Sequence, residues 1–469
     1  MMHRKSFVIL LILLALLPLG SGAGQKEAKS ASPAKNPPRP DRLAWYREAK
    51  FGMFIHWGPY SLASVEASWP IMQPAPGWPG VPLGWPGVIS EAEYRALPQR
   101  FNPVQFDPQA WVRLAKAAGQ RYMVMTSKHH DGFCMFDSAY TDYKITKTPY
   151  GKDILAQLER ACQEGDMPLG FYYSPPDMNH PAFRDTTKLA KSNWGGEPER
   201  PEWPLYLDYM ELQLTELLTR YGPGRVIWFD GLSHQEKYNG RRFHSLIHDL
   251  QPGTLINDRI GLPGDYDTPE QVVPDRIPVV TRGVQGFGTE HPPAAGLATA
   301  LPRPGEFRPW ETCMTINNTW AYNKNDRDFK SATQLIRTLV EVASKGGNLL
   351  LNVGPTPEGT IQPEFQERLL AIGEWLKVNG ESIYGTTYGP WQNLSFGKTT
   401  AKGNTIYLHV FDWPKGKLVV NGAKAGIVGV RLLATGKSLP FTQEGERLAI
   451  TVPAGAPDAH VSVLALRTH

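Results

Sequence analysis

The sequence predicts an α/β fold in which a (β/α)8-like (TIM) barrel is followed by a C-terminal antiparallel β-sandwich. Two observations predict this fold. Over residues 41–385, short apolar runs alternate with amphipathic stretches, and such alternation indicates parallel strands joined by helices. Over residues 386–469, the runs become short and alternating and are separated by turn residues, which is typical of a small sandwich. We therefore expect a barrel domain and a sandwich domain that meet near residue 385.

Seven runs in the first domain have the length and the β-branched or aromatic content of buried strands. They are residues 51–57, 121–130, 168–174, 225–231, 253–259, 311–317 and 348–354. Between them, residues 107–119 begin with an acid and a proline and end on glycine, as a helix does, and residues 207–221 repeat apolar side chains at helical spacing. The eighth strand of a closed barrel is missing from this series. A doubly wound open sheet is the alternative, but no glycine-rich dinucleotide loop follows the first strand.

The second domain contains five short alternating runs and no group with evident chemistry, so we expect it to be a packing domain. The runs are residues 405–413, 417–422, 428–433, 447–452 and 460–466.

One segment of the first domain is unusual. Residues 77–88, GWPGVPLGWPGV, contain too much Pro and Gly for helix or strand and must form a loop after the first strand. Trp78 and Trp85 would then either form a lip over a substrate or cap the edge of the barrel.

The N-terminus has the order of a secretory signal peptide. Arg4 and Lys5 precede an apolar run over residues 7–20, and small residues follow it. The run is shorter than the ~20 residues of a spanning helix, which argues against a membrane anchor. We expect residues 1–23 to be the signal peptide and the Pro-rich residues 24–40 to be a linker, so that the protein is secreted or periplasmic.

Composition excludes several classes of function. Lys and Arg number 49 against 45 Asp and Glu, a balance that favours neither nucleic acid nor a membrane surface as a partner. Three cysteines, Cys134, Cys162 and Cys313, allow one disulfide at most. The chain also lacks the Gly-x-Ser-x-Gly of serine hydrolases and a phosphate-binding loop. The chain has 14 Trp. The flat apolar face of a Trp ring can stack on a sugar ring, although Trp also fills protein cores.

Four chemically capable residues end predicted strands. His56, His129, His130 and Asp230 would lie at the carboxyl ends, where barrel enzymes keep their catalytic groups. Neighbours on an extended chain point to opposite faces, so His129 and His130 cannot easily bind one metal ion. A turn at residues 131–132 could instead let both line one pocket and bind hydroxyls. A rim of His, Trp, Tyr and carboxylates suits a glycosidase, which needs two carboxyl groups, and we expect no metal and no cofactor.

Several motifs, in order, resemble the α-L-fucosidases of glycoside hydrolase family 29. They are KFGMFIHWGPYS, SKHHDGF, FYYSP, WFDG, NDR, WETCMTINNTWAYN and GGNLLLNVGPTPEG. The resemblance runs from about Trp45 to Tyr384. It implies a barrel followed by a β-sandwich, no metal, and a retaining mechanism that releases terminal fucose from fucosylated oligosaccharides or glycoprotein glycans through a covalent fucosyl-enzyme. A related exo-glycosidase acting on another deoxy-sugar or on galactose is the closest alternative, and a silent sugar-binding homologue is the other.

The resemblance also assigns site residues. It makes Asp230 the nucleophile and places further side chains against the fucose: His56, His129, His130, Tyr172, Trp228 and Arg259. The family also places a Glu-Trp pair after the first strand against the substrate. Here Glu66 and Trp69 would be that pair and would bind the substrate, although two residues separate them.

Three glutamates compete for the role of general acid: Glu270, Glu306 and Glu311. Glu311 begins a predicted strand, so we expect it at the far end of the barrel. Glu306 lies in a Pro-rich approach to that strand. Glu270 follows Arg259 by the length of a loop, and its TPE resembles the acid/base segment of several bacterial fucosidases. We therefore assign the general acid to Glu270, with its carboxyl ~5 to 5.5 Å from that of Asp230, as in retaining enzymes.

Overall fold

The structure is a computed structural model that describes residues 41–72, 89–193, 195–231, 235–279 and 306–469. The expected signal peptide, the linker and the loop with Trp78 and Trp85 lie outside these residues.

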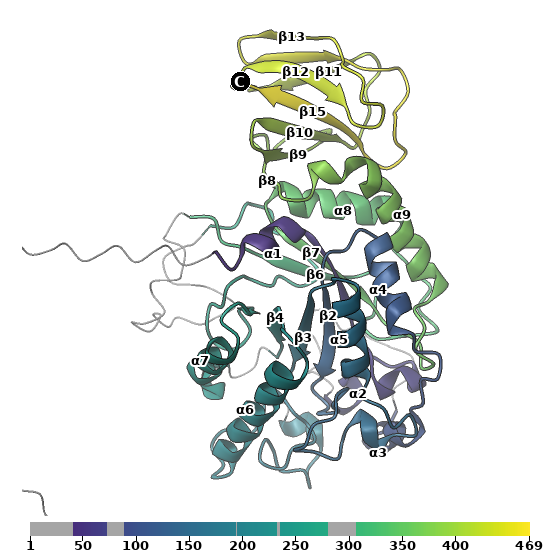
Figure 1. The fold of residues 1–469 in the computed structure, drawn as a ribbon, viewed down its shortest axis with the longest axis vertical. Coiled ribbons are helices and arrows are strands. Elements are labelled where there is room, and N and C mark those ends of the chain that lie inside the picture. The colour runs from purple at the N-terminus through teal and green to yellow at the C-terminus, as the bar shows by residue number, and fades with distance from the viewer. Residues whose placement is uncertain (1–40, 73–88, 194, 232–234, 280–305) are drawn as a thin grey trace, which may run out of the picture. The chain divides into compact units, whose positions relative to one another are not determined.

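All seven predicted barrel strands are present, and they form one parallel sheet in the order β5-β4-β3-β2-β1-β7-β6 (Figure 1). The prediction of parallel strands is therefore confirmed. The strands are β1 (Phe51–Ile55), β2 (Met123–Lys128), β3 (Leu169–Tyr173), β4 (Val226–Phe229), β5 (Leu255–Ile256), β6 (Glu311–Thr315) and β7 (Asn348–Val353).

An irregular segment, residues 266–270, occupies the eighth position between the two edge strands. Tyr266 makes a parallel bridge with Asn257, just after β5, whereas Glu270 makes one with Cys313 of β6. The backbone N–H of Gln271 donates to the carbonyl of Cys313 at 2.9 Å. Pro269 lacks an N–H and cannot complete a regular ladder. The eighth strand, which the sequence did not reveal, is therefore replaced by an irregular segment that pairs with β5 on one side and β6 on the other through isolated bridges.

Helices precede, separate and follow the strands (Figure 1). Two of them were predicted, and α4 begins as expected, because the Asp107 side chain accepts a hydrogen bond from the Ala110 N–H at 2.9 Å. The second, α6, begins at Trp203, before the predicted residue 207. The helices are α1 (Ala44–Ala49), α2 (Trp69–Met72), α3 (Glu91–Ala96), α4 (Pro108–Ala117), α5 (Ile154–Glu164), α6 (Trp203–Arg220), α7 (Gly240–Leu250), α8 (Ala332–Ser344) and α9 (Pro363–Asn379).

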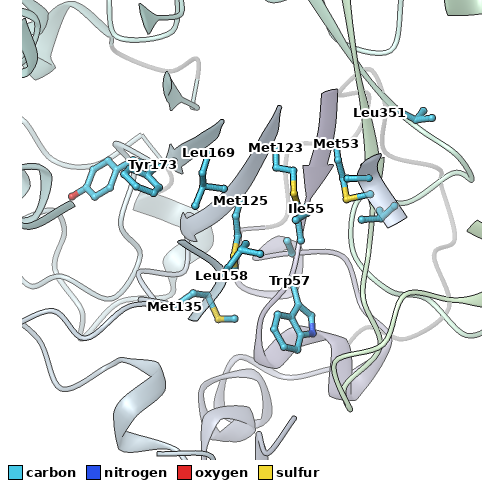
Figure 2. Packing of buried hydrophobic residues seen from close by; sticks show 14 of the residues in the cluster. Met53, Ile55, Trp57, Met123, Met125, Met135, Leu158, Leu169, Tyr173 and Leu351 are labelled. Atoms are coloured by element: carbon cyan, nitrogen blue, oxygen red, sulfur yellow. The ribbon is translucent and has the colours of Figure 1, made fainter. Parts of the chain in front are cut away.

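The sheet separates two apolar clusters because side chains alternate along each strand. Along β1, Met53 and Ile55 belong to the large cluster that includes helical residues such as Leu158 of α5 (Figure 2). Phe54 belongs to a second cluster with Tyr172 and Trp228. A fully buried Ile or Met contributes roughly 1.5–3 kcal/mol. The second cluster is unusually aromatic, and it lies under the pocket described below.

The C-terminal strands form a five-stranded and a three-stranded antiparallel sheet, which confirms the predicted sandwich. Its hydrogen bonds to the barrel helices include Trp375 Nε1 to the carbonyl of Val461 at 2.9 Å. The sequence did not reveal β8, β9 and β13. The strands are β8 (Thr387–Tyr388), β9 (Gly397–Lys402), β10 (Thr405–Val410), β11 (Lys417–Asn421), β12 (Ile427–Leu432), β13 (Phe441–Glu444), β14 (Arg447–Thr451) and β15 (Ser462–Thr468).

Cys134, Cys162 and Cys313 are buried free thiols. Among the described residues, no helix combines the length and the apolar character needed to cross a membrane.

Candidate active site

A pocket lies at the carboxyl ends of the parallel strands. His56 directly follows β1, His129 and His130 follow β2, and Asp230 follows β4. The carboxyl ends of parallel strands meet at one end of a barrel, so these groups converge there. The pocket is lined by these four residues together with Phe54, Trp69, Trp228, Glu270, Cys313 and Trp320.

Donors from several elements hold the carboxylate of Asp230. The Tyr172 hydroxyl donates to Oδ2 at 2.7 Å, and Arg259 Nη1 donates to Oδ1 at 2.8 Å. The Gly231 N–H also donates to Oδ1, at 2.8 Å. Burial alone raises the pKa of Asp230, but the charge of Arg259, the neighbouring His130 and these hydrogen bonds lower it to about 2. Asp230 is therefore ionised and fixed in place, as a nucleophilic carboxylate must be.

Glu270 binds the other nitrogen of the same guanidinium. Arg259 Nη2 lies 2.9 Å from Oε2 of Glu270, whose side chain is 39% exposed against 19% for Asp230. Desolvation raises the pKa of Glu270; Arg259 opposes this rise, and the negative charge of Asp230 adds to it. The environment therefore moves the two carboxyl pKa values apart, so that one group ionises and the other retains a proton more readily.

Arg259 is fixed in turn by the segment in the eighth position. Its Nε donates to Thr268 Oγ1 at 3.1 Å and its Nη2 donates to the Thr268 carbonyl at 3.0 Å. The guanidinium also lies over the Trp228 ring, 4.8 Å from the centroid. Because these contacts leave the guanidinium little freedom, Arg259 can set the relative positions of both carboxyl groups.

The other two candidate acids do not line the pocket. Glu311, the first residue of β6, is buried and accepts hydrogen bonds from the Tyr122 hydroxyl and, at 3.0 Å, from Trp228 Nε1. Burial raises the pKa of Glu311 to about 7, and those hydrogen bonds oppose the rise. Glu306 is exposed and lies outside the pocket. Of the three glutamates, only Glu270 reaches the pocket.

The three histidines lie together and are neutral. The chain leaves β2 at Lys128 and turns, so the adjacent His129 and His130 both face the pocket with ring centroids 4.2 Å apart. His56 is 5.7 Å from His129. Burial lowers the pKa of His56 and of His130 to about 4 and that of His129 well below its usual value. Neutral imidazoles are suited to hydrogen bonding with hydroxyls.

Tyr172 and Trp228 form a stacked wall beneath these groups. Their rings are 5.6 Å apart at 15°, and Tyr172 also stacks on His129 at 5.3 Å and 3°. Trp228 lines the pocket, whereas Tyr172 reaches it through its hydrogen bond to Asp230.

Of Glu66 and Trp69, which the resemblance pairs, only Trp69 lines the pocket. Trp69 begins α2 and lines the pocket. Glu66 is buried behind the pocket, where it accepts N–H bonds from Trp320 at 2.9 Å and from Ala321 at 2.8 Å. Its burial raises its pKa to about 7. The expected direct contact of Glu66 with substrate therefore differs from this arrangement, in which Glu66 fixes the loop that carries Trp320.

Sequence reasoning missed two groups of site residues. Phe54, Cys313 and Trp320 line the pocket, and each lies within a motif quoted above. Three buried polar residues hold the pocket histidines: Ser68, Ser174 and Asn352. Only their contacts in the folded chain reveal this role.

One cluster in the described residues has the composition of a metal site. Ligand atoms of His129, His130 and Asp230 lie within 4.8 Å of one another. However, the carboxylate of Asp230 already accepts hydrogen bonds from Arg259 and Tyr172. A divalent cation on Asp230 would also lie close to the positive guanidinium. These residues therefore fit a metal ion poorly.

The comparisons with known proteins agree with one another. The alpha-L-fucosidase family model matches residues 22–381. Plasma alpha-L-fucosidase of Homo sapiens is 31% identical over 424 residues, which cover 84% of this chain and 82% of that protein.

Solved structures give the same result. Alpha-L-fucosidase isoenzyme 1 from Paenibacillus thiaminolyticus matches with a TM-score of 0.77 and 34% identity, over 92% of this chain and 99% of that chain. A GH29 alpha-L-fucosidase from Bacteroides thetaiotaomicron, trapped as a covalent intermediate in complex with 2-fluoro-fucosyl fluoride, matches with a TM-score of 0.72 and 27% identity, over 91% and 96%. Thermotoga maritima alpha-fucosidase in complex with fucose has a TM-score of 0.69 and 30% identity, over 90% and 96%.

We predict that chelation leaves the folded protein unchanged. A metal ion bound to the native state would raise the midpoint of thermal unfolding through mass action. Dialysis against EDTA should therefore not shift that midpoint in scanning calorimetry, for the wild type or for Asp230→Asn as the control. A fall in the wild-type midpoint that zinc restores, absent in Asp230→Asn, would contradict the prediction.

Proposed function

Because the chain belongs to the alpha-L-fucosidase family of glycoside hydrolases, GH29, we infer that it is a retaining α-L-fucosidase in which Asp230 is the nucleophile and Glu270 is the general acid and base. Its substrates are glycans that carry terminal α-L-fucosyl residues. The observation that carries the assignment of the two carboxyl groups is their shared ion pair with Arg259 at the pocket.

The first step forms the covalent intermediate. Asp230 attacks the anomeric carbon of the fucosyl residue while the bond to the leaving oxygen breaks and Glu270 gives that oxygen its proton. In the second step, Glu270 takes a proton from water, and the resulting hydroxide displaces Asp230 from the anomeric carbon. Two inversions at this carbon give net retention. The Tyr172 and Arg259 hydrogen bonds keep Asp230 aligned for the first displacement and stabilise it as the leaving group of the second.

The lining of the pocket supports a deoxy-sugar as substrate. Fucose carries a methyl group where galactose-like sugars carry a hydroxymethyl group, and an apolar wall favours the methyl. Phe54, Cys313 and Trp320 supply apolar surface, while His56, His129 and His130 supply polar groups for the ring hydroxyls. An added hydroxyl against an apolar wall would have no partner, which disfavours galactosides.

Partners and location follow from the sequence. We propose that the natural substrates are fucosylated oligosaccharides or glycoprotein glycans, and that neither nucleic acid nor a membrane is a partner, because the charge balance favours neither. The signal-like order of residues 1–23 supports a secreted or periplasmic enzyme.

A panel of nitrophenyl glycosides tests the activity. We predict release from the α-L-fucoside with a kcat/KM well above that for the α-L-galactoside, which differs from it only by a hydroxyl on C6 and so does not present a methyl group to the apolar wall. Failure to release nitrophenol from the α-L-fucoside, or a preference for another sugar, would contradict the proposed function.

Azide rescue tests the nucleophile. Asp230→Gly should lose nearly all turnover, because no carboxylate remains to attack the anomeric carbon. Azide can enter the vacated space and attack from the same face, so it should restore turnover and yield the inverted β-fucosyl azide, identifiable by NMR. Glu306→Gly, a glutamate outside the pocket, is the matched control and should keep wild-type turnover. Wild-type turnover in Asp230→Gly would exclude Asp230.

The leaving group tests the general acid. Glu270→Ala should lose far more activity on a fucosylated oligosaccharide than on dinitrophenyl fucoside, whose leaving group needs no proton. In the wild type, kcat/KM should fall at high pH as Glu270, whose pKa is raised, loses its proton. It should fall at low pH only near the pKa of Asp230, about 2. Glu270→Ala should abolish the alkaline fall with the activated substrate. Equal losses on both substrates would overturn the assignment.

A further inference from the structure

We infer that each of the three pocket histidines is locked in one neutral tautomer by a buried neighbour. In His56 and His130, Nε2 is then unprotonated and can accept a hydrogen bond, whereas in His129 it carries the proton and donates. Asn352, Ser174 and Ser68 are the positioning residues that set this pattern. The structural part of this inference is independent of the activity, and its consequence for substrate rests on the proposed function.

Asn352 fixes His56. The Nδ2 of Asn352 donates to the carbonyl of Trp320 at 2.7 Å, so its Oδ1 faces Nδ1 of His56, also at 2.7 Å. The opposite orientation of the amide would put two oxygens in contact, because a carbonyl cannot donate. Nδ1 of His56 must therefore carry the proton and donate to Oδ1. Its Nε2 remains without a proton.

Ser174 fixes His130 in the same tautomer. The hydroxyl of Ser174 has one hydrogen, which it donates to the carbonyl of Pro176 at 2.7 Å. It also contacts Nδ1 of His130 and can only accept there, so Nδ1 of His130 carries the proton. The bare Nε2 of His130 lies 3.6 Å from Oδ2 of Asp230, where it can accept from a hydroxyl bound in the pocket.

Ser68 fixes His129 in the opposite tautomer. The oxygen of Ser68 accepts the backbone N–H of Asp131 at 2.9 Å. We place its remaining hydrogen on the contact with Nδ1 of His129 at 2.6 Å, because Ser68 is fully buried and its hydroxyl has no other acceptor among the residues that the structure describes. Nδ1 of His129 therefore accepts, and its proton lies on Nε2.

The two serines thus impose opposite polarity on adjacent histidines. The difference arises from their second partners, because a carbonyl takes the hydrogen of Ser174 whereas an N–H leaves the hydrogen of Ser68 free. Burial lowers the histidine pKa values, so the doubly protonated form does not erase the pattern at neutral pH. The pocket consequently requires one acceptor and two donors from the hydroxyls of the sugar.

Nitrogen NMR of the wild-type enzyme, labelled with ¹⁵N-histidine, reads the tautomers directly. In a neutral ring the nitrogen without a proton resonates far downfield of the protonated one. The expected result is a bare Nε2 for His56 and His130 and a bare Nδ1 for His129, with each ring assigned by its His→Gln variant. A bare Nδ1 in all three rings, the same tautomer in His129 and His130, or rapid averaging between tautomers would overturn the inference.

A serine variant tests whether the neighbour sets the tautomer. Ser174→Ala removes the acceptor of the Nδ1 proton, and we expect the proton of His130 to move to Nε2, beside Asp230. That change deletes a substrate contact and should lower kcat/KM about tenfold, the effect of one lost hydrogen bond. Ser382→Ala is the matched control, because Ser382 is equally buried and donates to the Asn379 carbonyl at 2.6 Å far from the pocket residues in sequence. It should change neither the His130 spectrum nor kcat/KM. An unchanged His130 spectrum in Ser174→Ala would show that Ser174 does not set the tautomer.

The two readouts separate the inference from the proposed function. The tautomer pattern in an enzyme that releases no fucose would support the inference and contradict the function. Fucose release by an enzyme with a different tautomer pattern would do the reverse.

Discussion

The guanidinium of Arg259 is the contact on which the active site depends. Its Nη1 binds Asp230 at 2.8 Å and its Nη2 binds Glu270 at 2.9 Å. Nη2 and Nε also donate hydrogen bonds to Thr268. Asp230 follows a regular strand, whereas Glu270 lies on the irregular segment that bridges β5 and β6. One cation therefore ties the end of a regular strand to an irregular part of the barrel wall. The pKa of Asp230 lies below its usual value, whereas burial and the negative charge of Asp230 keep the pKa of Glu270 above its usual value in spite of Arg259.

The barrel interior supports this contact from below. Trp228 lies under the guanidinium, and its Nε1 donates to Glu311, which begins β6 at the opposite end of the strands from the pocket. A buried carboxyl is costly unless its oxygens are hydrogen-bonded, and the Tyr122 hydroxyl supplies a second donor. Glu311 thus fixes the edge of the indole whose face contacts Arg259. The carboxyl that the sequence offered as a competing acid has a structural part in the same site, two contacts away from the chemistry.

Periodicity and strand ends predicted most of this fold, and the failures have physical causes. Seven strands were readable because buried parallel strands are continuous apolar runs. The eighth position was not, because residues 266–270 pair through isolated bridges and contain Pro269 instead of an apolar run.

Strand ends also brought His56 and Asp230 to one pocket. The resemblance placed Glu66 against the substrate, but two residues separate it from Trp69, and its carboxylate accepts the backbone N–H groups of Trp320 and Ala321 instead. Hydrogen-bond direction, as at Ser68 and Ser174, depends on contacts between distant segments, which no local pattern records.

The contrast in how the two carboxyl groups are held matches the two roles proposed for them. A nucleophile must be presented at a fixed angle and distance, and Asp230 is held by three donors, from Tyr172, Arg259 and its own neighbour Gly231. A general acid must meet leaving groups of different shape and then exchange its proton with water. Glu270 has one ion pair, is 39% exposed, and precedes Gln271, whose φ of 57° marks a turn rather than a strand. The irregular eighth position therefore leaves the proposed proton donor held by one ion pair and partly exposed to solvent. This difference in how the two carboxyl groups are held is consistent with the proposed acid lying at the gap in the barrel.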